Sequence, residues 1–77
     1  MNDLVELEPP VALLSSRELE VLEQVAMGES AKQVARSLLI APRTVEKHID
    51  NMRLKMHARN TAHLISRAFS IGALRPA

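Results

Sequence analysis

The side chains with the clearest chemical potential gather in residues 41–56, APRTVEKHIDNMRLKM. At helical spacing, Arg43, Lys47 and Asp50 share one side of this stretch, and Glu46 lies on its flank. A lysine can donate to guanine O6 or N7 or to a phosphate, and a glutamate can accept from cytosine N4. These residue types at this spacing indicate recognition of nucleic acid, and the alternative is an ordinary solvated helix face.

The remaining polar side chains do not suggest a catalytic or metal site. No serine has a base partner at a recognisable spacing, and Ser15 and Ser30 suit helix caps instead. His48, His57 and His63 lack the i, i+4 spacing of helical metal ligands, and the sequence has no cysteine. We therefore expect no metal, no cofactor and no enzyme activity, and we expect His48 to lie partly buried beside the core.

Residues 42–56 are predicted to form the amphipathic helix that positions the charged groups. Pro42 suits the first helical position, where a missing N–H costs nothing. The opposite face is apolar at helical spacing and consists of Val45, Ile49, Met52 and Met56. One side of this helix is thus committed to a core, and the other presents long charged side chains.

Two shorter helices are predicted before it, and each begins with a capping box. Ser15 with Glu18, and likewise Ser30 with Gln33, can exchange side-chain and backbone hydrogen bonds at a helix start. Gly28 suits the left-handed position that ends the first of these helices. The expected inward residues are Leu19, Leu22, Val25 and Ala26 in the first helix and Ala31, Val34, Ala35 and Leu38 in the second. Helices joined by so few residues must cross steeply, which is helix-turn-helix geometry.

A fourth helix is predicted to follow, with Asn60 as its cap and Gly72 at its end. Its expected apolar stripe comprises Ala62, Ile65, Ala68 and Phe69, widened by Leu64 and Ile71. Leu38, Leu39 and Ile40 are expected to form a compact apolar turn before the third helix. Because no strand-like alternation occurs in the sequence, the predicted fold is all-α with four helices.

Composition agrees with one small globular domain. The chain has 77 residues, of which 47% are hydrophobic and 25% charged. No apolar run approaches the roughly 20 residues of a membrane span, so no membrane partner is expected. The absence of cysteine favours a cytoplasmic location.

Charge is distributed unevenly along the chain. Residues 1–40 carry three basic and seven acidic side chains, a balance of −4, whereas residues 41–77 carry seven basic and two acidic ones, a balance of +5. Such asymmetry suggests a positive surface for a polyanion. We expect residues 1–13, with three acidic side chains and two prolines, to be a flexible acidic leader, and residues 14–77 to be the folded domain.

The run LSSRELEVLEQVAMGESAKQVARSLLIAPRTVEKHIDNMRLKM resembles the LuxR-type (GerE-like, FixJ/NarL) helix-turn-helix domain. The match covers about residues 14–72 without gaps. The residues that carry it are Leu14, Arg17, Glu18, Glu20, Val21 and Leu22, then Gly28, Ser30, Lys32, Val34 and Ala35, then Thr44, Val45, His48, Lys55 and Met56. With only about 13 residues before it, the chain resembles the stand-alone members of this bacterial family of transcription regulators.

The resemblance implies that the third helix enters the major groove of double-stranded DNA. It assigns base contacts to Glu46, Lys47 and Asp50 and phosphate contacts to Lys32, Arg43 and Thr44. Two departures from the family pattern are Ala41, where a serine or threonine usually caps the helix at a benefit of about 1 kcal/mol, and His57, which replaces a glycine. Asp50 is also unusual there, and it reads a base, pairs with Arg53 or weakens DNA binding.

The resemblance further implies that the fourth helix mediates homodimerisation, which we assign to Leu64, Ala68 and Ile71. The alternative is that these residues only complete a thin core without aromatics. The expected function is sequence-specific DNA binding by a transcriptional regulator acting as a homodimer. The alternative function is an interaction module that dimerises with a full-length LuxR-type regulator and modulates it. Such a regulator and RNA polymerase are the candidate protein partners.

Overall fold

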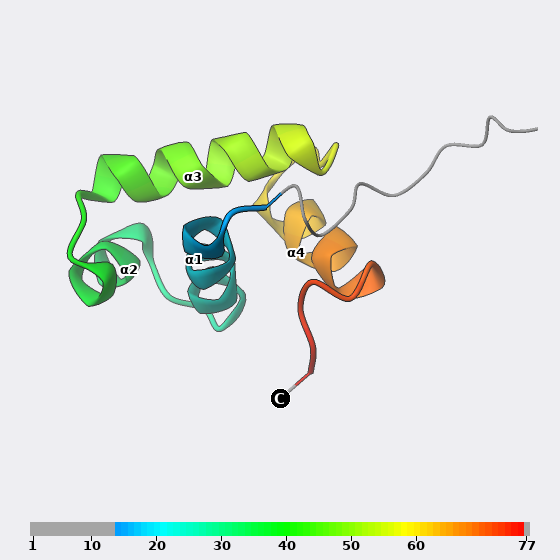
Figure 1. Ribbon diagram of the computed structural model, residues 1–77, viewed down its shortest axis with the longest axis horizontal. Coiled ribbons are helices and arrows are strands. Elements are labelled where there is room, and N and C mark those ends of the chain that lie inside the picture. The colour runs from blue at the N-terminus through cyan, green and yellow to red at the C-terminus, as the bar shows by residue number, and fades with distance from the viewer. Residues whose placement is uncertain (1–13, 77) are drawn as a thin grey trace, which may run out of the picture.

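Four helices form the domain (Figure 1). The structure is a computed structural model that describes residues 14–76. The helices are α1 (Ser16–Ala26), α2 (Ala31–Leu38), α3 (Pro42–Lys55) and α4 (Thr61–Ser70), and no strand occurs within the described residues. The prediction of an all-α, four-helix fold is confirmed. The expected leader, residues 1–13, lies outside the described residues.

Both predicted capping boxes are present. At the start of α1, Ser15 Oγ accepts from the Glu18 backbone N–H at 3.0 Å, and the Ser15 N–H donates to Glu18 Oε1 at 2.9 Å. At the start of α2, Ser30 and Gln33 make the same reciprocal pair at 3.2 and 2.7 Å. Gly28 follows the C-cap of α1 with a φ of +95°, the left-handed conformation that its position required. These caps fix the ends of the two helices that support α3.

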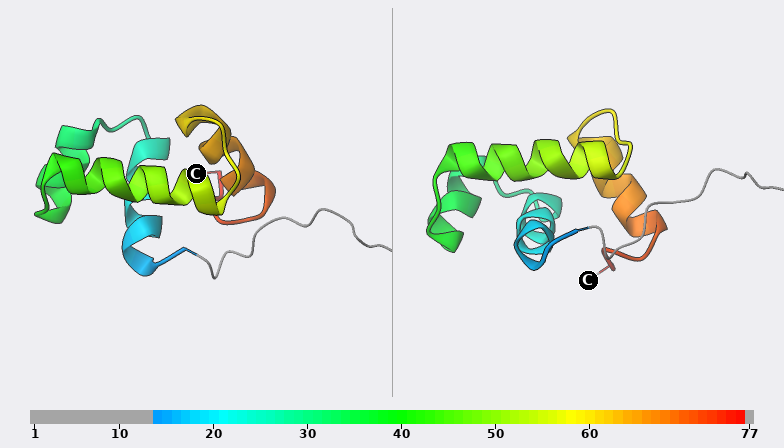
Figure 2. Two further views of the ribbon diagram at one scale, coloured as in Figure 1. Left: turned by 90° about the horizontal axis from the view of Figure 1, so that it is seen from above. Right: turned by 45° about the horizontal axis from the view of Figure 1, so that its top comes forward.

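α3 is the longest helix, with 14 residues, and it runs along one side of the domain (Figure 1). Seen from above, α1 crosses α3 steeply, while α2 and α4 lie near opposite ends of α3 (Figure 2). α3 packs against all three other helices. Because those contacts use one face of α3, its opposite face is left to solvent.

The core lies between α3 and the helices beneath it. Val45, Met52 and Met56 have no exposed surface, and Ile49 is partly buried, so the predicted apolar face of α3 is confirmed. The other buried hydrophobic residues are Leu14, Val21, Leu22, Val34, Ala35, Leu64, Ala68 and Leu74. Val21 lies outside the stripe predicted for the first helix but is fully buried, because α1 packs against both α2 and α3.

Two apolar predictions need correction. In α4, Leu64 and Ala68 are the buried pair, whereas Ala62 and Phe69 of the predicted stripe are exposed. Leu64 and Ala68 are four residues apart and Ala62 and Phe69 are seven apart, so the members of each pair lie on one face of the helix. Periodicity alone could therefore not decide which pair faces the core. In the turn before α3, Leu39 is 91% exposed and adopts a left-handed φ of 60°, which directs its side chain to solvent instead of into a compact apolar turn.

The connection from α3 to α4 is held by side-chain hydrogen bonds. Arg67 Nε donates to the Met56 carbonyl, and Asn60 caps α4 as predicted by accepting from the His63 N–H at 2.8 Å. His57 has a φ of 55°, which explains why a glycine is usual at this position. A histidine in this left-handed conformation carries backbone strain that a glycine would not.

Candidate nucleic-acid interface

The six residues predicted to contact DNA are all exposed. Five of them, Arg43, Thr44, Glu46, Lys47 and Asp50, lie on α3, and Lys32 lies in the first turn of α2. On α3, the positions of Arg43, Lys47 and Asp50 are opposite the fully buried Val45 and Met52. The structure thus brings the α3 residues to the solvent side of a helix whose other side is anchored.

The first turn of α3 offers a site that favours an anion. Ala41 is the N-cap and makes no side-chain hydrogen bond, and Pro42 has no N–H to donate. The positive end of the helix dipole is therefore not covered by a capping oxygen. Arg43 and Thr44 are exposed in this same turn, where a guanidinium and a hydroxyl can add donors to a phosphate.

Lys47 and Glu46 are available for contacts outside the domain. Within residues 14–76, neither side chain forms a salt bridge or a hydrogen bond. A free ammonium can donate to guanine or phosphate, and a free carboxylate can accept from cytosine N4. In the free domain these two side chains are therefore solvated and unpaired, and their contacts with DNA stay a prediction.

Asp50 is paired within the helix. Its Oδ1 lies 3.4 Å from Arg53 Nη2, and Arg53 Nη1 also donates to the Arg59 carbonyl at 3.2 Å. Of the three interpretations considered for Asp50, the structure supports pairing with Arg53. The pair reduces the repulsion that an isolated carboxylate would exert on a phosphate backbone.

A second ion pair, which sequence reasoning missed, fixes α3 on α1. Lys55 Nζ lies 2.8 Å from Glu18 Oε1, and the Glu18 side chain is only 5% exposed. Burial by itself would raise the pKa of Glu18. The hydrogen bonds from Lys55 and from the Ser15 N–H, with the positive charges of Lys55 and His48, outweigh burial and lower this pKa below its ordinary value. Glu18 and Lys55 both belong to the sequence blocks that carry the family resemblance. That shared membership is the signal in the sequence that could have indicated a contact between residues 37 positions apart.

The residues predicted to form a dimer surface lie largely inside the protomer. Leu64 and Ala68 are fully buried and Ile71 is partly buried. Completion of the core, the alternative interpretation, therefore holds for Leu64 and Ala68, and these two side chains cannot meet a second chain in this fold. The side of α4 that remains open contains the small residues Ala62 and Ser66.

The described residues contain no group of three or more His, Asp or Glu side chains that could hold a metal ion. His48 is partly buried, as expected, and is the smallest of the contributions that lower the pKa of Glu18. No helix among residues 14–76 is long and apolar enough to cross a membrane. The chemistry of the site thus rests on exposed cations, one hydroxyl and two carboxylates.

Comparison with known proteins identifies the family. Residues 12–68 match the family described as bacterial regulatory proteins, luxR family (GerE). The transcriptional regulatory protein FixJ of Rhizobium meliloti (strain 1021) is 38% identical over 72 residues, which cover 94% of this chain and 35% of that protein. The nitrate/nitrite response regulator protein NarP of Escherichia coli (strain K12) is 43% identical over 53 residues, or 69% of this chain and 25% of that protein.

A solved structure shows the same fold. The crystal structure of full-length FixJ from B. japonicum superposes with a TM-score of 0.72 at 40% identity, over 84% of this chain and 32% of that one. The chain thus spans only about a quarter to a third of the length of these relatives. The relatives are regulators of transcription and not enzymes. The chain therefore belongs to the luxR family of bacterial regulatory proteins, as a DNA-binding helix-turn-helix domain of a transcriptional regulator.

Proposed function

We propose that the domain binds a specific DNA sequence by placing α3 in the major groove. The observation that carries the proposal is two unpartnered charges on the exposed part of α3: Lys47, opposite the face fixed in the core, and Glu46 on its flank. Lys47 donates to a guanine edge and Glu46 accepts from a cytosine. Arg43 and Thr44 hold a phosphate at the start of the helix, and Lys32 on α2 holds another.

In this proposal Asp50 belongs to the DNA-facing side without reading a base. Its ion pair with Arg53 keeps a cation beside the carboxylate, at 3.4 Å. The Arg53 side chain is one-third exposed, so the pair can face a phosphate as a near-neutral unit. Asp50 then holds Arg53, which also donates to the Arg59 carbonyl, and adds no base contact of its own.

We also propose that the domain acts as a homodimer on two half-sites. Two copies related by a two-fold axis would each place α3 in the major groove, which requires a DNA site of matching symmetry. Ala62 and Ser66 on the open side of α4 are small enough to let two helices approach closely. Ile71, which is partly exposed, can contribute apolar surface at the end of α4.

Lys47→Ala tests the assignment of α3. The variant should bind its target about 10- to 100-fold more weakly, because it loses a base contact worth about 1–3 kcal/mol. Its thermal stability should not change, since Lys47 is exposed and unpaired in the described residues. Fluorescence anisotropy with a target selected from random DNA measures the affinity.

Arg75→Ala is the matched control, because Arg75 is an exposed cation in the segment after α4, and this segment runs away from α3 (Figure 1). It removes the same charge and should leave the affinity within about twofold, as expected for a cation that touches no phosphate. Equal affinities of Lys47→Ala and the unaltered chain would refute the assignment of Lys47. An equal loss in both variants would show that only total charge matters.

A second candidate function is an interaction module that binds and modulates a full-length LuxR-type regulator. One observation favours it: Leu54 is 75% exposed on the open side of α3, where a protein contact would suit it better than DNA. Capture of such a regulator, together with no binding to any DNA at low salt, would support this function over the first.

A further inference from the structure

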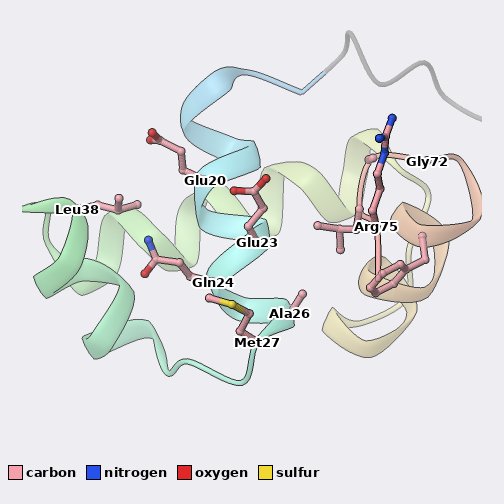
Figure 3. A pocket seen from close by; sticks show the side chains of 11 residues that line it. Glu20, Glu23, Gln24, Ala26, Met27, Leu38, Gly72 and Arg75 are labelled. Atoms are coloured by element: carbon pink, nitrogen blue, oxygen red, sulfur yellow. The ribbon is translucent and has the colours of Figure 1, made fainter. Parts of the chain in front are cut away.

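We propose that a groove formed without α3 binds a basic amphipathic segment of a partner protein. The groove has a volume of about 680 Å³ and lies between the C-terminal half of α1, the end of α2, the end of α4 and residues 72–75 (Figure 3). No residue of α3 lines it. A ligand in this groove would therefore leave the proposed DNA-binding side of the domain free.

The groove exposes apolar side chains that do not contribute to the buried core. Met27 is 73% exposed, and Phe69, the only aromatic residue of the chain, is 42% exposed; both line the groove. Leu38 and Leu74 contribute further apolar lining. Methionine adapts its shape to a ligand, and a concave apolar surface that the fold itself does not cover is typical of a binding site for another molecule.

The two walls of the groove differ in charge. Glu20 and Glu23 stand on the α1 wall, and Arg75 stands across from them on the C-terminal segment (Figure 3). Glu23 has no ion-pair partner within residues 14–76, and Glu20 pairs only with the exposed Arg17, at 3.3 Å. A ligand that lies in the groove would turn its cations toward α1 and its apolar side chains toward Met27 and Phe69.

This charge pattern selects among possible ligands. The N-terminal residues of the chain carry Asp3, Glu6 and Glu8, which Glu20 and Glu23 would repel. DNA is repelled for the same reason. Two of its apolar lining residues, Met27 and Phe69, are themselves exposed to solvent, whereas small-molecule sites enclose most of their ligand. A helix with an apolar stripe flanked by lysine or arginine satisfies the shape, the apolar lining and the acidic wall together.

The test uses the full 77-residue chain and a short amphipathic peptide of leucine and lysine, with a leucine–glutamate peptide of the same pattern as its counterpart. Amide chemical shifts in NMR titrations, measured without DNA, locate the contact and give the affinity. The basic peptide should shift residues around Met27 and Phe69 and leave α3 unchanged, and the acidic peptide should bind about tenfold more weakly or not at all.

Charge reversals on the two walls should act in opposite directions. Glu20→Lys with Glu23→Lys should weaken binding of the basic peptide about tenfold, and Arg75→Glu should strengthen it. Glu29→Lys is the control, since Glu29 follows α1 but does not line the groove, and it should have little effect. All variants change exposed or half-exposed side chains, so their circular dichroism spectra should match that of the unaltered chain.

Three results would overturn the proposal. Shifts that centre on α3 or are scattered over the surface would place the peptide elsewhere. Equal binding of the basic and acidic peptides would show that Glu20 and Glu23 do not select the ligand by its charge. Shifts of Glu23, Met27 and Leu38, the groove residues that are far from the proposed dimer surface, that depend on protein concentration without peptide would show that a second copy of the chain occupies it. Because no DNA is present, none of these results depends on whether α3 reads DNA.

Discussion

The negative charge of Asp50 is offset by a neighbouring cation on the same helix. A carboxylate on the open side of α3 would repel phosphates, yet its Oδ1 lies 3.4 Å from Arg53 Nη2. Arg53 in turn donates to the Arg59 carbonyl, in the connection to α4. The proposed role of Asp50 is therefore to hold a cation in place, and a base contact is not needed to explain its presence.

Asp50→Asn separates these two roles. If Asp50 only holds Arg53, the variant should bind the same DNA sequence more tightly, by on the order of threefold at low salt, because one negative charge near the phosphates is lost. Its free energy of unfolding should fall by less than about 1 kcal/mol, since the pair is exposed. Affinity measurements and a repeated sequence selection provide the check. A changed sequence preference with weaker binding would show that Asp50 reads a base.

At the scale of elements, α3 differs from the other three helices in how it begins. α1 and α2 begin with complete capping boxes, and α4 begins with the Asn60 cap, but α3 begins at Ala41 without a side-chain acceptor. Because Pro42 has no N–H and the Thr44 N–H donates to the Ala41 carbonyl at 2.9 Å, the uncapped first turn leaves the Arg43 N–H open for a phosphate, at a cost in stability of the free domain.

Ala41→Thr should restore the missing cap and raise the free energy of unfolding by about 0.5–1 kcal/mol. Ala41→Val is the matched control, because valine has nearly the same shape but no acceptor, and it should give no gain. Urea unfolding followed by circular dichroism measures both. A threonine variant no more stable than the valine variant would mean that the start of α3 does not need a cap.

The ion pair between Glu18 and Lys55 joins α1 to the end of α3. Glu18→Gln keeps an acceptor for the Ser15 N–H but removes the charge that faces Lys55. We expect it to lower the free energy of unfolding at neutral pH by about 1–2 kcal/mol, less than for a fully buried pair because Lys55 is 38% exposed. Unfolding experiments at neutral pH, with Glu29→Gln as an exposed-site control, measure this loss.

The same pair predicts how stability depends on pH. Because folding lowers the pKa of Glu18 from its ordinary 4.5, the stabilisation is complete above that value and is lost as the pH falls below it through the pKa of the folded state. The difference in stability between the unaltered chain and Glu18→Gln should therefore shrink over that acidic range. A difference that stays constant from neutral to acidic pH would contradict the lowered pKa.

At the scale of the whole molecule, the sequence predicted what depends on local patterns. The capping boxes, the Gly28 and Asn60 positions and the apolar face of α3 are encoded by neighbours in the chain, and all are confirmed. The exposed positions of the predicted DNA contacts follow from the same helical spacing. The local sequence pattern was therefore sufficient to predict where the helices lie in the chain and which side of α3 is exposed.

Contacts between distant segments could not be predicted in this way. The phase of α4 depends on how it packs on the rest of the domain, and Leu64 is buried while the equally apolar Phe69 is not. The Glu18–Lys55 pair joins residues 37 positions apart. The groove exists only because α1, α4 and the C-terminal segment meet. Each of these features is a property of the assembled fold.

Selection of bound DNA from a random library, with the mass of the complex measured alongside, tests the central claim most directly. If α3 reads the major groove in a symmetric pair, the enriched sequence should be palindromic and the complex should contain two chains. Its affinity should fall steeply with salt, because each chain neutralises several phosphates. A library that remains unenriched at low salt, or a single chain bound to a non-repeated site, would contradict the account.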